Sequence, residues 1–418
     1  METSLYIEKK QEFKNLLSIR DYRYLMLSQI ISSLGAGVYQ FALIWYMKLL
    51  TNDAVFVSFI TIAQFVPLLL TSIFAGVIVD RGHTKRINMI SKLVCSITLF
   101  LLVLFIFLDK IQPILLLCVA FILSVFSAFI QPATSVMIRT IVPSELMERA
   151  QSLSFTILRS LSLLSLPLAA FLFRYGAQFT FIFDATSYLL SFLFLYFIKN
   201  KHLRKSTLSD LTFKKSFLDL KEGLVFIRNH SFLRNILIYI TLINFILAPI
   251  SILFAFTVSN QDELALLQAG TPIGSIIGFF ILNKISKIKS LTKIIIGILL
   301  SLVGSCLFTF PFGIYFGIIF SVLIGTGIAF ISITTNTVIA LVTPKEMLGR
   351  VSSMNMIIVL CFLPVGSFFG SVLSNFISIR YIFGLMSISL IMILLLMIFN
   401  KKLQNYDNDK LIISGNSQ

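Results

Sequence analysis

The sequence predicts an all-α membrane protein in which twelve transmembrane helices form two pseudo-symmetric halves of six. Three observations support this fold class: the composition, the lengths of the apolar runs and an internal repeat. Of the 418 residues, 57% are hydrophobic and only 12% are charged, and the mean hydropathy is +0.95. Soluble domains carry about 25% charged residues. The chain is therefore expected to cross a lipid bilayer many times.

The apolar runs give the expected helices in order, because a spanning helix needs about 20 mainly apolar residues. Runs of this kind cover 24–48, 54–79, 87–108, 113–138, 150–173, 178–198, 232–258, 263–283, 293–311, 313–338, 351–374 and 381–399. A polar stretch separates the sixth run from the seventh. We therefore expect a first bundle over 1–198, a cytoplasmic central loop over 199–231, and a second bundle with a short cytoplasmic tail over 232–418.

A repeated segment relates the two halves. Ile141–Arg149 reads IVPSELMER and Val342–Arg350 reads VTPKEMLGR, so both contain Pro-x-Glu-x-x-x-Arg at an offset of 201 residues. Each copy follows the fourth run of its half and opens the fifth. Parallel six-helix repeats related by an axis along the membrane normal are typical of one large class of secondary transporters.

The distribution of cationic residues predicts the orientation. With both termini in the cytoplasm, all but five of the 34 Lys and Arg residues fall in inner segments, and Lys92 is counted with the inner loop after the second run. The outer side keeps Lys48, Lys110, Arg174 and Arg380, and Arg159 lies within a span. Such a bias indicates cytoplasmic termini. It also explains the net charge of +16 without a nucleic-acid partner.

The chemistry of catalysis is not visible in the sequence. The four cysteines lie inside apolar runs and the three histidines in polar segments, without the spacing of a metal site. No phosphate-binding loop and no nucleophile–base pattern occurs. We therefore expect no cofactor, no metal, no catalytic residue and no enzymatic activity.

Several motifs resemble the major facilitator superfamily, and within it the macrolide-efflux branch of drug–proton antiporters. They are Gly76-x-x-x-Asp80-Arg81 with Lys85-Arg86, the paired Pro-x-Glu-x-x-x-Arg segments, Asp184-Ala-Thr, Lys221-Glu222-Gly223, Leu348-Gly349-Arg350-Val351 and Pro364-Val-Gly366. The similarity runs from about Ser18 to Phe399. The chain departs from the superfamily loop at His83 and Thr84, and its second half has no comparable loop.

The resemblance implies a proton-driven exporter of a hydrophobic drug, such as a macrolide, that works by alternating access. It implies a monomer in the bacterial inner membrane, with an amphipathic small molecule, protons and the lipid bilayer as partners. Two alternatives remain at this point. One is an exporter of a siderophore or a lipid-like metabolite, and the other is a membrane scaffold or sensor that keeps the fold without transport.

The resemblance also implies a cytoplasmic gate. Asp80 would face the start of helix eleven near Arg350, whose exposed N–H groups favour an anion. The alternative is that these charges are those of any inner loop. The candidate gate residues are Gly76, Asp80, Arg81, Lys85, Arg86, Glu145, Arg149, Glu346 and Arg350.

The second of the repeated segments also reads as a helix start. Thr343, Pro344 and Glu346 have the spacing of a capping box, with proline at the first helical position. Glu346 and Arg350, like Glu145 and Arg149, are spaced to pair along one helix face. These residues are therefore expected to cap and stabilise helices, to take part in the gate, or both.

Arg159 and Asp184 are interpreted as the only full charges well inside the spans. Counted from the helix ends they lie about 15 Å and about 20 Å above the inner face, within reach of each other. They form either a static ion pair or a proton-coupling pair. In the second case Asp184 carries the proton, because burial makes a carboxyl group hold its proton up to neutral pH, and Arg159 competes with that proton.

The substrate cavity is expected between helices one, four, seven and ten, as the resemblance implies. Its polar or aromatic candidates are Gln29, Tyr39, Gln40, Gln131, Asn244 and Asn336. The alternative role of these side chains is hydrogen bonding between helices. A cavity so poor in charge and rich in phenylalanine would suit a bulky amphipathic compound.

Overall fold

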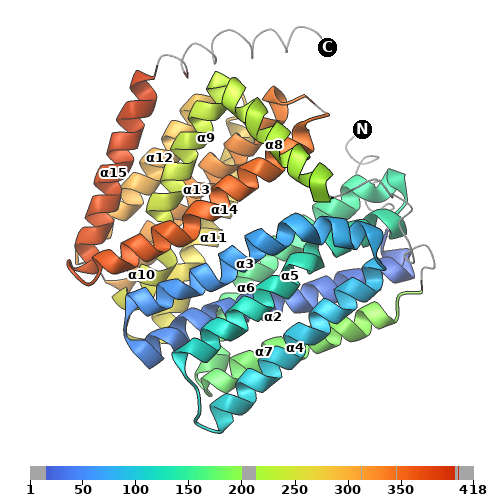
Figure 1. Ribbon diagram of the computed structural model, residues 1–418. Coiled ribbons are helices and arrows are strands. Elements are labelled where there is room, and N and C mark those ends of the chain that lie inside the picture. The colour runs from blue at the N-terminus through green and yellow to red at the C-terminus, as the bar shows by residue number, and fades with distance from the viewer. Residues whose placement is uncertain (1–15, 200–212, 312, 345, 401–402, 404–418) are drawn as a thin grey trace, which may run out of the picture. The chain divides into compact units, whose positions relative to one another are not determined.

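The structure is a computed structural model that describes residues 16–199, 213–311, 313–344, 346–400 and 403. These residues form α-helices and one short 3₁₀ turn, and no strand occurs among them (Figure 1). Eleven helical segments in this part of the chain are long and apolar enough to cross a membrane. The remaining helix of the predicted set is α6 (Met147–Phe173), whose end from Ser160 to Phe173 is also apolar. The predicted twelve-helix, all-α membrane fold is confirmed.

The chain forms two compact units, and each is described by itself. The first contains the described parts of Met1–Thr51 and Val66–Ser216. Its elements are α2 (Arg20–Thr51), the second part of α3 (Ala54–Arg81), α4 (Thr84–Phe107), α5 (Pro113–Ile141), the 3₁₀ turn η1 (Ser144–Leu146), α6 and α7 (Ala177–Tyr196). Helix α7 packs against α2 and α4, α4 also packs against α5, and α2 also packs against α6. The core of this unit therefore lies between α2, α4 and α7.

The second unit contains Asn52–Phe65, which is the start of α3, and the described part of Phe217–Gln418. Its other elements are α8 (Phe213–Asn229) from Phe217 on, α9 (Ser231–Leu247), α10 (Ile250–Thr257), α11 (Gln261–Lys284), α12 (Ser290–Leu307), α13 (Ile314–Val342), α14 (Leu348–Leu373) and α15 (Ile379–Phe399). Helix α13 packs against α11 and α12, and α14 packs against α9. Close packing of α11 on α13 requires glycine, because a Cβ at Gly325 would overlap the backbone carbonyl of Thr271.

Large apolar side chains are exposed on the outside of both units. On α4, Ile97, Leu101 and Leu104 recur at helical spacing and are each about half exposed. On α15, Ile388 and Met392 are exposed as well. Continuous apolar faces of this kind are rare on soluble monomers and suit contact with lipid tails. The chain is thus a multi-pass membrane protein.

The internal repeat has the same helix boundaries in both units. Helix α5 ends at Ile141 and α6 begins at Met147, whereas α13 ends at Val342 and α14 begins at Leu348. Both pairs of boundaries differ by the 201 residues that separate the two sequence copies. The Pro-x-Glu-x-x-x-Arg segment is therefore the connection between the fourth and fifth helices of each half.

The seventh predicted run, 232–258, forms two helices and not one. It is broken at Ala248 and Pro249 into α9 and α10. Proline has no N–H to continue the helical ladder. The Ser367 hydroxyl of α14 donates to the Ala248 carbonyl oxygen at 3.1 Å, so α14 satisfies one of the backbone groups at the break.

Candidate functional site

Asp184 lies at the centre of the first unit. Its side chain, on α7, is fully buried. The Ser187 hydroxyl donates to Asp184 Oδ1 at 3.2 Å, while Oδ2 has no hydrogen-bond partner among the described atoms. On α2, a Cβ at Gly35 would lie 2.5 Å from Asp184 Oδ1, so glycine is what allows the carboxyl group to fit between the helices. A buried carboxyl with one unsatisfied oxygen is well suited to bind a proton.

Arg159, the predicted partner of Asp184, lies on α6, but its side chain is outside the described part of the chain. The ion pair between the two residues therefore stays a prediction. Lys92, which the sequence did not predict to be buried, lies inside the same unit. Its side chain on α4 is 1% exposed.

The assignment of Lys92 to the cytoplasmic loop was wrong, as was the conclusion that Arg159 and Asp184 are the only charges inside the spans. Lys92 Nζ donates to Ser28 Oγ at 2.8 Å and Ser32 Oγ at 3.3 Å on α2, and to Ser191 Oγ on α7. A sequence signal existed: Asn88, Lys92 and Ser96 are spaced by four residues on a mainly apolar helix, which puts them on one face.

The second unit contains a cavity of about 340 Å³ between α9, α13 and α14. Two of the predicted substrate residues, Asn244 on α9 and Asn336 on α13, line it together. Asn355 on α14 was not predicted but also lines it, and its Oδ1 is buried without a hydrogen-bond partner. The rest of the lining is mostly aliphatic and carries no charged side chain. A cavity of this size holds a small ligand or one end of a larger one.

The other four substrate candidates lie in the first unit and not on this cavity. Tyr39 is buried on α2, its ring 6.0 Å from that of Phe181, and its hydroxyl has no hydrogen-bond partner among the described atoms. Gln29 is partly buried with an unpartnered Oε1, whereas Gln40 and Gln131 are exposed. Tyr39 therefore belongs to the surroundings of Asp184, and a substrate contact stays a prediction for all four.

The structure describes the side chains of only some of the predicted gate residues in the first half. Asp80 and Arg81 end α3, but their side chains lie outside the described part of the chain, so the predicted contact of Asp80 with helix eleven stays a prediction. A Cβ at Gly76 would meet no described atom within 4 Å. Lys85 Nζ donates to the carbonyl oxygens of Tyr196 and Ile198, at 2.9 and 2.7 Å. Lys85 therefore caps the C-terminal end of α7.

Arg86 and Glu145 are exposed, and Arg149 lies in the first turn of α6. The Ser144 hydroxyl donates to Glu145 Oε1 at 2.9 Å. A hydrogen bond from the backbone N–H of Glu145, together with the Ser144 hydroxyl, holds the pKa of the Glu145 carboxyl below its usual range. Glu145 is therefore ionised at neutral pH and held by its own turn.

The capping interpretation of the second repeat is wrong in detail. Thr343 directly follows the end of α13 as its C-cap, and its buried hydroxyl has no described hydrogen-bond partner, while α14 begins only at Leu348. Glu346 is exposed in the intervening turn. The predicted partner of Arg350 also differs, since its guanidinium pairs with Asp219 at 2.8 Å and with Glu222.

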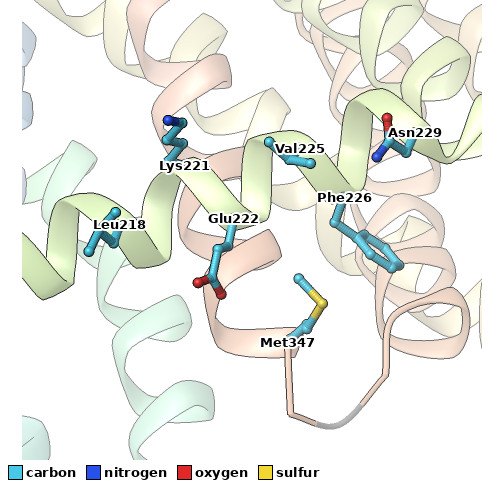
Figure 2. Close-up of a pocket in the computed structure, with 7 residues that line it drawn as sticks. All are labelled: Leu218, Lys221, Glu222, Val225, Phe226, Asn229 and Met347. Carbon is cyan, nitrogen blue, oxygen red and sulfur yellow. The ribbon is translucent and has the colours of Figure 1, made fainter.

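Both acidic partners of Arg350 come from α8. On the same helix, a Cβ at Gly223 would lie 2.7 Å from the Arg350 carbonyl oxygen, so the two helices are in close contact there. Figure 2 shows Glu222 and Phe226 on the side of α8 that faces Met347, and Lys221 on the opposite side. The start of α14 is thus attached to α8, so part of the predicted central loop is a helix that anchors helix eleven.

Charge reversal tests this pairing. Arg350→Glu is expected to detach the start of α14 from α8 and lower the unfolding midpoint of the purified protein, and Arg350→Glu combined with Asp219→Arg and Glu222→Lys to restore part of it. Arg350→Glu with Glu346→Lys is the control, which should restore nothing because Glu346 is not the partner. Loss of either ion pair should lower the free energy of unfolding by only about 1 kcal/mol, because the charged groups are partly exposed. Recovery with Glu346→Lys would contradict the assignment.

Comparison with known proteins identifies the family. A model of the Major Facilitator Superfamily matches residues 25–362, so the chain belongs to this superfamily. It is therefore a membrane transporter and not an enzyme. A comparison with curated proteins found no match. The family assignment agrees with the resemblance seen in the sequence, but the macrolide-efflux branch stays a prediction.

Solved structures show the same fold. The nucleoside transporter NupG superposes with a TM-score of 0.75 at 11% identity, covering 90% of this chain and 98% of that one. A POT family transporter in complex with 5-aminolevulinic acid gives 0.71 at 14% identity, covering 92% and 96%. A bacterial homologue of the human drug peptide transporters PepT1 and PepT2 gives 0.66 at 12%, covering 93% and 99%. At such identities the likeness shows the fold alone.

Proposed function

We propose that the protein is a proton-driven exporter of a hydrophobic, amphipathic compound of the macrolide type. The observation that carries this proposal is Asp184, a fully buried carboxyl group with an unsatisfied oxygen. An ionisable side chain inside a membrane span is costly to maintain and is commonly part of an ion pathway. Alternating access then couples the loading of this proton to movement of the substrate.

The cavity of the second unit supports the substrate class. Its lining is mostly aliphatic, with three amide and three hydroxyl side chains, and no charged or aromatic group contributes to it. Such a surface favours an uncharged or weakly charged molecule with hydroxyl or amine donors, and it gives no counter-charge for a phosphate. The unpartnered Oδ1 of Asn355 would accept a hydrogen bond from such a donor.

The orientation belongs to the same proposal. The loops rich in Lys and Arg favour both termini in the cytoplasm. The bacterial inner membrane and the monomeric state are part of the proposal through the resemblance to the macrolide-efflux branch. Export then means that substrate leaves toward the outer side while protons enter.

A transport panel tests the function. The chain is overexpressed and deleted in a bacterial host, and efflux of labelled erythromycin, other antibiotics, a siderophore, nucleosides and short peptides is followed with and without a protonophore. We expect active efflux of a hydrophobic drug that the protonophore abolishes. Efflux of only a siderophore or a lipid-like compound would show that the substrate is of that class and not a hydrophobic drug. The absence of any flux would favour a scaffold or sensor and contradict the proposal.

Asn355→Ala tests the cavity. Loss of the amide should weaken binding of labelled erythromycin, or of the compound that the panel identifies, by about tenfold, because a buried hydrogen bond is worth about 1.5 kcal/mol. Binding is measured on purified protein by scintillation proximity. Asn375→Ala, at an exposed asparagine after α14, is the matched control. Equal affinities for the two variants would show that the cavity does not hold the ligand.

A further inference from the structure

A stripe of small and polar side chains runs along the contact between α2 and α7. Ser28 on α2 meets Ser191 on α7, their hydroxyl oxygens 2.6 Å apart, and Gly35 meets Ser187 and Asp184 two turns further along. Residue numbers rise on α2 as they fall on α7, so the two helices are antiparallel. Lys92 lies at one end of the stripe and Asp184 toward the other.

The ammonium group of Lys92 is enclosed by neutral oxygens. Its three N–H groups donate hydrogen bonds to the hydroxyl oxygens of Ser28, Ser32 and Ser191. The Ser28 carbonyl oxygen lies 3.4 Å from Lys92 Nζ. An ammonium group has three donors, so this set of acceptors satisfies it. No carboxylate is paired with it in the described residues. A positive charge buried in this way is unfavourable unless an opposite charge balances it nearby.

Asp184 is the acidic group that can balance this charge. It lies seven residues from Ser191 on the same face of α7, a separation of about 10 Å at 1.5 Å per residue. Lys92 Nζ contacts Ser191 Oγ, so its charge lies beyond ion-pair distance of Asp184, and a charge about 10 Å away still shifts a titration by about one pH unit at an effective dielectric constant of about 20. The other titratable groups of this cluster in the described residues are Cys95 on α4, Tyr39 on α2 and Tyr188 on α7.

Helix α5, which also packs on α4, contributes only neutral groups at this level. Asn88 Nδ2 of α4 donates to Thr134 Oγ1 of α5 at 3.1 Å and lies 3.8 Å from the sulfur of Met137. Helix α5 therefore adds no charge at this level. Helix α6 also packs on α2 and α7 and carries Arg159, whose side chain lies outside the described part of the chain.

We propose that Lys92 is the resident counter-charge of Asp184 and sets the pH at which Asp184 takes up and releases its proton. This inference rests on the proposed function, in which Asp184 is the proton carrier. The serine hydroxyls accept the hydrogen bonds of the protonated Lys92 ammonium group, and in this proposal Asp184 is the group that titrates. When Asp184 is ionised the pair is neutral, and when it binds a proton from one side of the membrane the pair carries one positive charge. Lys92 is therefore a positioning residue that favours release of the proton.

Infrared titration of the purified full-length protein tests this coupling without a substrate. The C=O stretching band of protonated Asp184, assigned by its absence in Asp184→Asn, is followed as a function of pH. In Lys92→Met the midpoint should rise by about one pH unit, the size of a unit-charge interaction across about 10 Å at an effective dielectric constant of about 20. Lys92→Arg keeps the charge and should show no rise. Lys287→Met, at an exposed lysine, is the control and should leave the midpoint unchanged.

An unchanged midpoint in Lys92→Met would overturn the inference and reduce Lys92 to an anchor between helices. If Lys92→Met does not fold, the double variant Lys92→Met/Asp184→Asn, which is neutral at both positions, should recover the folded yield. Failure to recover it would also overturn the inference. The proposed function is tested separately. It fails if Asp184→Asn still transports with proton coupling, even when Lys92→Met shows the expected infrared shift.

Discussion

Asp184→Asn is expected to abolish proton-driven transport while leaving the substrate pathway open. Asparagine has nearly the same size as aspartate but cannot bind and release a proton, so it should fit beside Gly35 and Ser187. In proteoliposomes with an imposed pH gradient, the variant should bring labelled erythromycin only to an accumulation ratio of about 1, because an uncoupled carrier equilibrates its substrate. Exchange of labelled for unlabelled substrate should continue.

The matched control is Asp109→Asn, at an exposed aspartate between α4 and α5. Its backbone φ is +52°, a conformation that asparagine also adopts readily. This variant should accumulate substrate as the wild type does. Accumulation against a gradient by Asp184→Asn would rule out Asp184 as the coupling residue.

Gly325→Ala is expected to produce the largest loss of stability. The added Cβ would overlap the Thr271 carbonyl oxygen and lie 2.7 Å from two further backbone atoms of Thr271, and backbone cannot move aside as a flexible side chain can. Separating α11 from α13 should cost about 3 kcal/mol. That loss corresponds to a fall of about 5 °C in the unfolding midpoint.

The unfolding midpoint is measured in detergent by size-exclusion chromatography after heating. Gly349→Ala, in the first turn of α14, is the control because a Cβ there would meet no described atom within 4 Å. It should be neutral or slightly stabilising, since alanine favours a helix over glycine. Equal midpoints for the two variants would contradict the close packing of α11 on α13.

The fold was predictable because a bilayer imposes a simple rule on sequence. Every span must be a long apolar helix, so length and hydropathy located the helices, and the repeated Pro-x-Glu-x-x-x-Arg segment related the halves. The break at Pro249 was missed because the apolar run continues through it. Its freed carbonyl group is satisfied by Ser367, which lies more than a hundred residues away in the chain.

The sites were less predictable because they depend on contacts between distant helices. Asp184 was found from its charge alone, since a carboxylate inside an apolar run is conspicuous. Lys92 was assigned to the loop because it follows other cations by only a few residues. Arg350 was given a partner on its own helix, whereas Asp219 and Glu222 come from a helix that only the folded chain brings near.

In the proposed function, substrate and proton move in opposite directions through the same protein, and a flux measurement tests this coupling most directly. Proteoliposomes containing the protein and a pH-sensitive dye are given an erythromycin gradient, or one of the compound that the panel identifies, without any imposed pH gradient. We predict that the substrate flux drives a proton flux in the opposite direction and that Asp184→Asn abolishes the proton flux. Substrate movement at the same rate with no change in internal pH would contradict the account.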